Sequence, residues 1–260
     1  MFRSTWLIAR SVLIEAIRRR EIYAIVLVTL LMIGAALTLD FFNMTGLEKF
    51  YREVSLKVMS AATALTVVVL AARQLPREFR NRTIYPMMAK PVSRVTFLLG
   101  KLAGVVLAGA FCFALFMLVY VGGALYLGQS IPWGLFLQYV WLQLWMLGLL
   151  AALCFWLSLL FNLDAAITIG VIFYLVSSTI NNLISELYDF SGPAAKGMLL
   201  GLNYLLPNLT LFDLSEKAVH AGDVWGPVSA GVLLAVTAYG LFWVAVYFGL
   251  AMISFRRKPL

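Results

Sequence analysis

The sequence has few charged residues for its length. Asp, Glu, Lys and Arg make up only 12% of its 260 residues, about half the share of a soluble domain, whereas 63% are hydrophobic. A soluble fold of this size cannot bury so much apolar surface, so lipid must cover part of it. The length suits one membrane domain, 1–260, with no sizeable soluble domain beside it.

Residues that carry metals or catalysis are also scarce. The two cysteines, Cys112 and Cys154, lie within apolar runs, which favours small buried side chains over a disulfide or a metal role. His220 has no Cys, His or acidic neighbour at ligand spacing and is typical of a solvated loop residue. The apolar runs contain neither paired acids nor a nucleophile with a base, so we expect no enzyme active site.

A phosphate-binding loop is missing as well. Before Gly100-Lys101, Val95 stands where that loop needs a glycine, and Leu102 stands where it needs Ser or Thr. The chain therefore cannot bind ATP by this route, and we expect no cofactor of its own. The shortage of charge inside the apolar runs counts against an ion-coupled transporter or a proton pump.

The sequence does contain six apolar runs that are long enough to cross a bilayer. A spanning helix needs about 20 mainly apolar residues. The runs are 22–42, 54–72, 95–127, 134–161, 165–187 and 228–255. The third is so long that it must tilt, kink or extend out of the bilayer.

The basic residues indicate how these runs are oriented. If the N-terminus is cytoplasmic, fifteen of the twenty Lys and Arg residues fall on the cytoplasmic side, and eight of the twelve acids fall outside. Such an excess of inner positive charge is the usual signal of membrane topology. It supports an even number of spans with both ends in the cytoplasm, and it explains the net charge of +8 without nucleic acid as a partner.

Two further segments complete the predicted all-α integral membrane fold. Residues 1–20 place arginines and serines on one helical arc and Trp6 with aliphatic residues on the other, which predicts an interfacial amphipathic helix. A polar-faced extension of the first span is the alternative. Residues 194–220 are apolar but too short to span, and we predict a re-entrant pair of short helices on the outer side, before the last span.

Polar residues within the runs have two interpretations. They are Gln138, Gln143, Ser177, Ser178, Asn181 and Asn182. Hydrogen bonding between helices is the simpler one, and the lining of a translocation pathway is the other. The pair Gly100 and Gly104 predicts a close helix contact at the start of the third span.

The most distinctive segment is the cytoplasmic loop 73–94. Pro76 suits the first turn of a helix, and Pro86 and Pro91 suit its end, so we predict a short basic helix over 76–90 beneath the bilayer. With Phe79 as its exposed apolar side chain, it is typical of a docking element. Alternatively, its arginines serve only topology and the binding of anionic lipids.

This loop resembles one found in the permease subunits of ABC-2-type ABC transporters. The pattern there is E-x-x-x-G-T, followed at fixed distances by Pro, Arg and a Gly-Lys pair. The matching positions here are Glu78, Thr83, Pro91, Arg94, Gly100 and Lys101. The six runs, the amphipathic N-terminus and the re-entrant stretch also match, although Arg82 stands where the family usually has Gly, and Pro86 where it has an acidic or polar residue.

The resemblance implies a mechanism. Two permease subunits, identical or homologous, would pair in the cell (inner) membrane among its lipids. Each would bind a separate ABC ATPase subunit, which holds the ATP, through a coupling helix at 76–90. The docking residues would be Arg77, Glu78, Phe79, Arg80, Arg82 and Thr83.

We therefore expect an exporter's membrane subunit. A scaffold or assembly subunit that works with an ATPase but transports nothing is the main alternative. A secondary transporter, which would need no ATPase, fits the lack of intramembrane charge less well.

Overall fold

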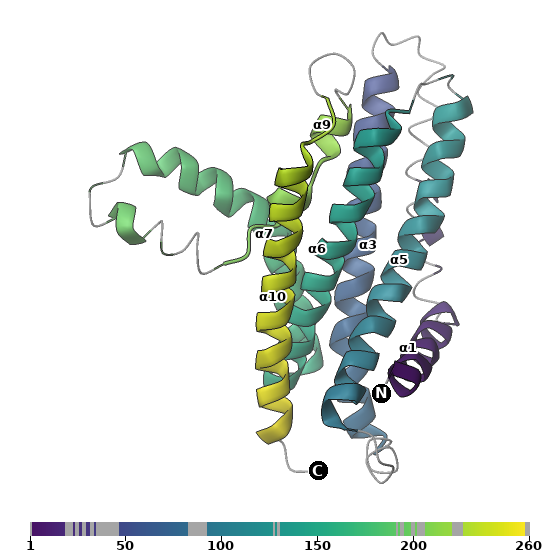
Figure 1. Ribbon diagram of the computed structural model, residues 1–260, viewed down its shortest axis with the longest axis vertical. Coiled ribbons are helices and arrows are strands. Elements are labelled where there is room, and N and C mark those ends of the chain that lie inside the picture. The colour runs from purple at the N-terminus through teal and green to yellow at the C-terminus, as the bar shows by residue number, and fades with distance from the viewer. Residues whose placement is uncertain are drawn as a thin grey trace.

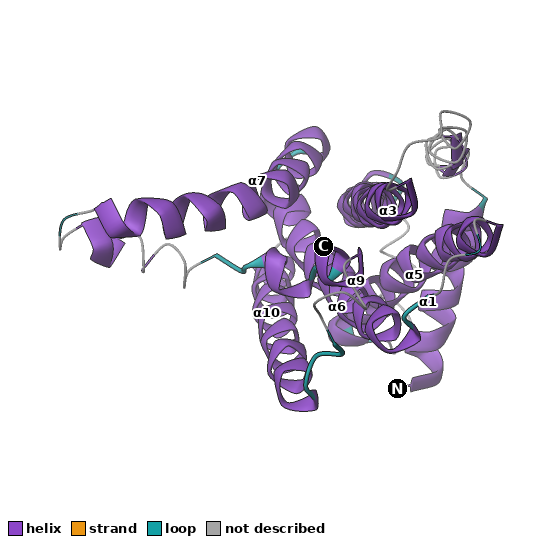
Figure 2. Ribbon diagram, turned by 90° about the horizontal axis from the view of Figure 1, so that it is seen from above, coloured by secondary structure: helices purple, strands orange, loops and turns teal. Residues whose placement is uncertain are grey.

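The computed structural model shows a bundle of long helices (Figure 1). It describes residues 2–18, 23, 26–27, 30–31, 34, 47–82, 93–126, 128, 131–190, 192, 195–198, 201, 206–219 and 226–257. Within these residues the regular elements are all helices, with no strand, as Figure 2 also shows. The all-α prediction is therefore confirmed for the described part of the chain.

Four of the helices are long and apolar enough to cross a bilayer. They are α3 (Leu47–Arg80), α5 (Arg94–Tyr126), α6 (Trp133–Leu160) and α10 (Ala230–Arg257). They coincide with the runs predicted to begin at residues 54, 95, 134 and 228, although α3 extends well beyond its run at both ends. The run 22–42 lies mostly outside the described residues, so the count of six spans stays a prediction.

The fifth run corresponds to α7, Leu163–Phe190. This helix starts at the lower end of the bundle in Figure 1, and its C-terminal part turns away from the other helices and runs out to the side (Figures 1 and 2). Only the first part of α7 therefore packs within the bundle. The residues that follow include a helical piece at 195–198.

The lower end of the bundle in Figure 1 gathers several chain segments. There α3, α6 and α10 end, α5 and α7 begin, and both termini lie nearby. The last turns of α3 and α10 at this end carry arginines, among them Arg80 and Arg257. The charge pattern predicts that this is the cytoplasmic end.

The N-terminal helix α1, Phe2–Ile17, packs against the lower part of α5. A Cβ atom on Gly100 would lie 2.8 Å from Cβ of Ile8, and one on Gly104 would lie 2.6 Å from Cβ of Val12. Only glycine permits so close an approach, so the predicted contact is confirmed and α1 is its partner. Trp6 is 58% exposed and lines a pocket with Leu99 and Leu102 of α5, and we predict that it lies at headgroup depth.

One prediction about the docking loop is wrong. We expected a new helix to begin at Pro76, but α3 continues through Pro76 to Arg80. An interior proline removes one backbone hydrogen bond, a loss that membrane helices tolerate when neighbouring groups satisfy the carbonyl. The rest of the predicted coupling helix, from Thr83 to Lys90, lies outside the described residues.

The segment before α10 is broken more often than we expected. We predicted a pair of short helices over 194–220, and its described residues hold a helical piece at 195–198, a 3₁₀ helix η2 (Leu209–Phe212) and a short α9 (Ser215–Val219). The side chain of Asp213 separates η2 from α9, because its carboxylate accepts a hydrogen bond from the Ser215 N–H at 2.9 Å.

Candidate functional site

The end of α3 has a defined geometry. The Asn81 N–H donates to the Arg77 carbonyl at 2.9 Å, and the Arg82 N–H donates to the Phe79 carbonyl at 3.3 Å. Arg82 has φ +55°, in the left-handed region that ends many helices and favours glycine. This is the position where the resembled pattern has its Gly, and glycine adopts a φ of this sign most readily.

A buried ion pair joins α3 to α5 at this end. The Lys101 ammonium lies 2.5 Å from the Glu78 carboxylate, and their side chains are only 5% and 15% exposed. Lys101 also donates to Oε1 of Gln74 at 3.3 Å, and its ammonium lies 5.9 Å from the centre of the Phe97 ring. Two residues that the sequence pattern places 23 positions apart thus form one contact.

Phe79 is half-buried and packs within the chain. Its ring centre lies 6.0 Å from that of Phe255 on α10, and Phe255 in turn stacks on Phe97 of α5 at 6.1 Å. These three rings connect the end of α3 to the first turn of α5 and the last turn of α10. A movement of the α3 end would therefore displace α5 and α10 as well.

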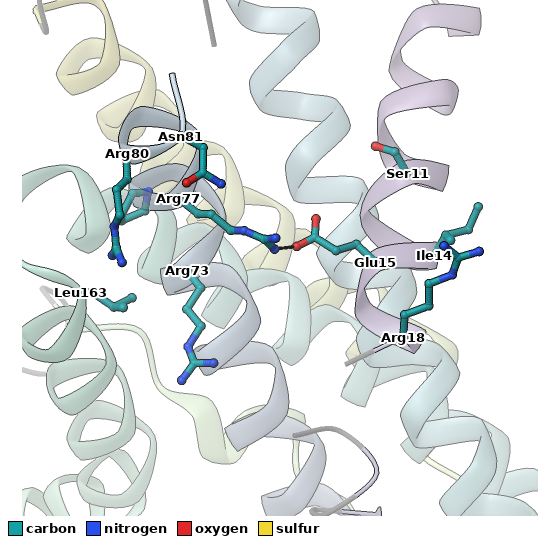
Figure 3. A pocket seen from close by; sticks show the side chains of 10 residues that line it. Ser11, Ile14, Glu15, Arg18, Arg73, Arg77, Arg80, Asn81 and Leu163 are labelled. Atoms are coloured by element: carbon teal, nitrogen blue, oxygen red, sulfur yellow. Dashed lines mark hydrogen bonds and ion pairs between the residues drawn. The ribbon is translucent and has the colours of Figure 1, made fainter. Parts of the chain in front are cut away.

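The neighbouring Arg77 points toward α1. Its guanidinium forms an ion pair with the Glu15 carboxylate, shown by the dashed line in Figure 3. Both side chains are partly exposed, at 50% and 33%. They line a pocket of about 830 Å³ that α1, α3 and the start of α7 enclose. We call this the arginine pocket, and its described lining is Ser11, Ile14, Glu15, Arg18, Arg73, Pro76, Arg77, Arg80, Asn81 and Leu163.

The predicted docking residues therefore differ in their surroundings. Glu78 is held by Lys101 and Phe79 by aromatic packing, whereas Arg80 and Arg82 are exposed at the end of α3. Thr83 lies outside the described residues. The exposed pair is the part of the set that a partner protein would reach first, and the assignment of the whole set to docking stays a prediction.

The polar residues predicted for a pathway are hydrogen-bonded between elements. Gln138 bonds both backbone groups of Val228 at 2.9 Å, which ties α6 to the start of α10. Gln143 donates to the Ser60 hydroxyl of α3 at 2.8 Å, and the Ser177 hydroxyl accepts from the Leu209 N–H at 3.2 Å. These contacts match the simpler interpretation, hydrogen bonding between helices.

The remaining three residues of the predicted pathway lie further along α7. Ser178, Asn181 and Asn182 belong to the helix, but their side chains lie outside the described part of the structure. Their role in a pathway therefore stays a prediction.

A second pocket, of about 440 Å³, lies toward the opposite end of the bundle. Its described lining combines charged and hydroxyl groups with apolar side chains: Lys57, Ser60, Ala61, Met146, Tyr174, Leu175, Leu209, Thr210, Asp213 and Glu216. We call it the upper cavity. Ser60 connects it to the predicted residue Gln143, since the two side chains are hydrogen-bonded.

Sequence reasoning missed several residues of both pockets. Nothing in the sequence around Glu15 indicates Arg77, 62 residues away, as its partner. Lys57, Asp213 and Glu216 were counted only as charges for topology. Their grouping in one cavity depends on how α3, η2 and α9 pack, which no local pattern reports.

The described residues contain no group of three or more His, Cys, Asp or Glu side chains that could hold a metal ion. Cys112 and Cys154 are both free and buried, as predicted. Cys154 fills the space beside Gly170, where an added Cβ would lie 2.8 Å from its sulfur. Its role in this part of the chain is therefore core packing.

Comparison with known proteins decides the family. The family model described as "ABC-2 family transporter protein" matches residues 16–187, which is more than half of the chain. The matched residues include α3, α5, α6 and the start of α7, where Leu163 lines the arginine pocket. The chain belongs to the ABC-2 transporter family. It is accordingly a multi-pass membrane protein, with several helices able to span the bilayer. No curated protein matches the chain.

Proposed function

We propose that this ABC-2 family member is the permease subunit of an ATP-driven export complex in the cell membrane. In this proposal two permease subunits pair, each binds an ABC ATPase at the lower end, and the termini are cytoplasmic. The observation that carries the proposal is the Glu78–Lys101 contact, because it joins two positions of the resembled sequence pattern at the end of α3 where Arg80 and Arg82 are exposed. ATP is bound and hydrolysed by the partner subunit.

The contacts at the lower end suit the transmission of movement. The end of α3 is tied to α5 by the buried ion pair, to α10 through Phe79 and Phe255, and to α1 through Arg77 and Glu15. A force applied at Arg80 or Arg82 would move these helices together, because packed helices shift as rigid bodies. The ATPase would thus act on several membrane helices through one attachment.

The docking step can be tested with a charge reversal at exposed residues. Phe79 is unsuitable, since replacing it would disturb its packing against Phe255. We expect the double variant Arg80→Glu and Arg82→Glu to lose its ABC ATPase in pull-downs from native membranes, and with it the ATPase activity of the purified complex. The matched control is Arg256→Glu with Arg257→Glu, which makes the same charge change on exposed residues of α10.

Equal recovery of the ATPase with both double variants would contradict docking at the end of α3. Loss with both would point to general electrostatic attraction to the lower end. Either result would leave membership of the family intact, because that rests on the match over residues 16–187.

We also propose that the substrate path passes through the upper cavity. Its mixture of hydroxyl, charged and apolar lining suits an amphipathic solute better than a small ion. In proteoliposomes containing the complex, a bulky thiol reagent on Thr210→Cys should block ATP-driven flux, whereas Leu118→Cys on the exposed face of α5 should not respond. The native cysteines are buried, so they should react little.

Flux also separates export from scaffolding. A scaffold would stimulate ATP hydrolysis by its partner without moving any candidate solute across the vesicle membrane. An exporter should show both stimulated ATP hydrolysis and flux of the solute. Thiol labelling of Thr210→Cys should abolish the flux while the ATPase subunit remains bound.

A further inference from the structure

The arginine pocket has an unusual balance of charge. Among the described residues that line it, four are arginines and one, Glu15, is acidic. Figure 3 shows Arg77 reaching toward Glu15, while Arg73 and Arg80 lie on the side of Leu163. A pocket of about 830 Å³ is large enough for a small ligand rather than a single water-sized ion. Its chemistry is that of a site for an anion with several oxygen atoms.

The depth of the pocket identifies where such an anion would come from. Arg73 lies seven residues before Arg80 on α3, so it sits about 10 Å inside the end of the helix. The pocket is also bounded by α1, whose side chains Trp6 and Ile14 are 58% and 40% exposed and suited to the leaflet. We therefore place Arg73 at the level of the lipid headgroups, whereas Arg80 lies at the end of the helix.

The lining of the pocket also includes apolar side chains. Ile14, Pro76 and Leu163 line the same pocket as the arginines. A free inorganic anion would make no favourable contact with these apolar side chains, whereas a phospholipid presents a phosphate joined to apolar chains. An acidic segment of a partner protein would have to enter past the level of α1 to reach Arg73.

We propose that the arginine pocket binds the phosphate of an anionic phospholipid from the leaflet in which α1 lies. Arg73 and its neighbours on α3 donate to the phosphate oxygens, because a guanidinium presents paired N–H groups that match them. Ile14 and Leu163 contact the apolar part of the lipid. Glu15 holds Arg77 against α1, which keeps the wall between α1 and α3 in place.

This site does not depend on ATPase docking. It uses Arg73, which lies above the proposed docking residues, and it can be measured on the purified chain without any partner. Arg80 lines the pocket and also belongs to the docking test, so the lipid site is tested with Arg73→Gln, which leaves Arg80 and Arg82 unchanged. The two tests also have different readouts, lipid binding and ATPase recovery, so either proposal can fail without the other.

The test is native mass spectrometry of the full chain in detergent, titrated with dioleoylphosphatidylglycerol or dioleoylphosphatidylcholine. We expect the unmodified chain to prefer the anionic lipid by about tenfold, because both lipids offer the same phosphate but the choline ammonium of the other lipid is repelled by the four arginines. Arg73→Gln should lose this preference, and Arg73→Lys should keep part of it. The control is Arg10→Gln, an exposed arginine of α1 that does not line the pocket, which should retain it.

Several results would overturn the proposal. One is an equal affinity of the unmodified chain for both lipids, and another is an undiminished preference in Arg73→Gln. Displacement of the lipid by millimolar inorganic phosphate would assign the site to a free anion. Loss of ATPase recovery in Arg73→Gln with lipid binding intact would assign it to the partner protein. If Arg73→Gln does not fold, the exposed pocket residue Arg18 replaces it as Arg18→Gln, with the same expected loss.

Discussion

Two neighbouring residues at the end of α3 make ion pairs of opposite character. Glu78 pairs with Lys101 of α5, and both side chains are nearly inaccessible, at 15% and 5% exposure. Arg77 pairs with Glu15 of α1, and both side chains remain partly exposed, at 50% and 33%. One turn of helix thus holds a structural contact on one face and an exposed contact beside a pocket on the other.

The difference follows from desolvation. A buried charge that loses its partner cannot recover its hydration, whereas an exposed one is solvated by water and screened by salt. We therefore expect the Glu78–Lys101 contact to hold the end of α3 in position. The Arg77–Glu15 contact should stabilise that position only weakly. Four substitutions break or sharpen this comparison.

The largest effect is expected for Lys101→Met. The change leaves the Glu78 carboxylate buried without its lysine and should lower the free energy of unfolding by about 3 kcal/mol. The matched control is Lys57→Met, since Lys57 pairs with Glu53 at 2.9 Å in an exposed i,i+4 contact. That change should cost less than about 1 kcal/mol. Equal shifts in denaturant unfolding in detergent would show that burial does not distinguish the two pairs.

Gly104→Val tests the packing of α1, the helix that carries Glu15, against α5. The new side chain would overlap Cβ of Val12 and approach the Ala9 carbonyl, so we expect a loss of about 2 kcal/mol. With spin labels attached in place of Arg10 and Leu118, the distribution of distances between the labels should also broaden as α1 moves. In Gly122→Val, where an added Cβ meets nothing within 4 Å, the distance should stay unchanged. Broadening in both variants would mean that the glycine pair does not position α1.

A smaller gain is expected for Arg82→Gly. Glycine adopts the φ of +55° without the clash of a side chain, which should stabilise the helix end by about 1 kcal/mol. Arg82→Ala removes the same charge but keeps the strain, so it should give no gain. The thermal unfolding midpoint of the purified chain measures both, and equal stabilisation would assign the effect to charge.

The smallest effect is expected for Glu15→Gln. Because its pair with Arg77 is exposed, the free energy of unfolding should fall by about 0.5 kcal/mol, and less in high salt. Glu53→Gln provides a control in the other exposed pair. A loss comparable with that of Lys101→Met would show that the Arg77–Glu15 contact is as structural as its neighbour.

Local patterns predicted the elements of this fold better than their partners. The apolar run 95–127 predicted α5 (Arg94–Tyr126), and the structure explains its start, because the Ser93 hydroxyl accepts from the Thr96 N–H at 3.1 Å as a helix cap does. The glycine pair predicted a close contact without saying that α1 would fill it. The prediction of a helix start at Pro76 was wrong, because α3 continues through this proline. Proline usually begins or ends a helix, but packing on either side of α3 overrides that preference here.

The helices α6 and α10 separate what the sequence determined from what tertiary structure decided. Both have 28 residues and a mean hydropathy of 1.9 in their most apolar window, yet 67% of that window is buried in α6 and 11% in α10. Hydropathy records only the preference of each side chain for an apolar surrounding, and lipid satisfies it as well as protein does. The sequence therefore determined the long helices, the charged end and the family. Which helix lies at the centre, and which charges meet across 23 or 62 residues, was decided by packing, because these contacts form only when distant segments come together.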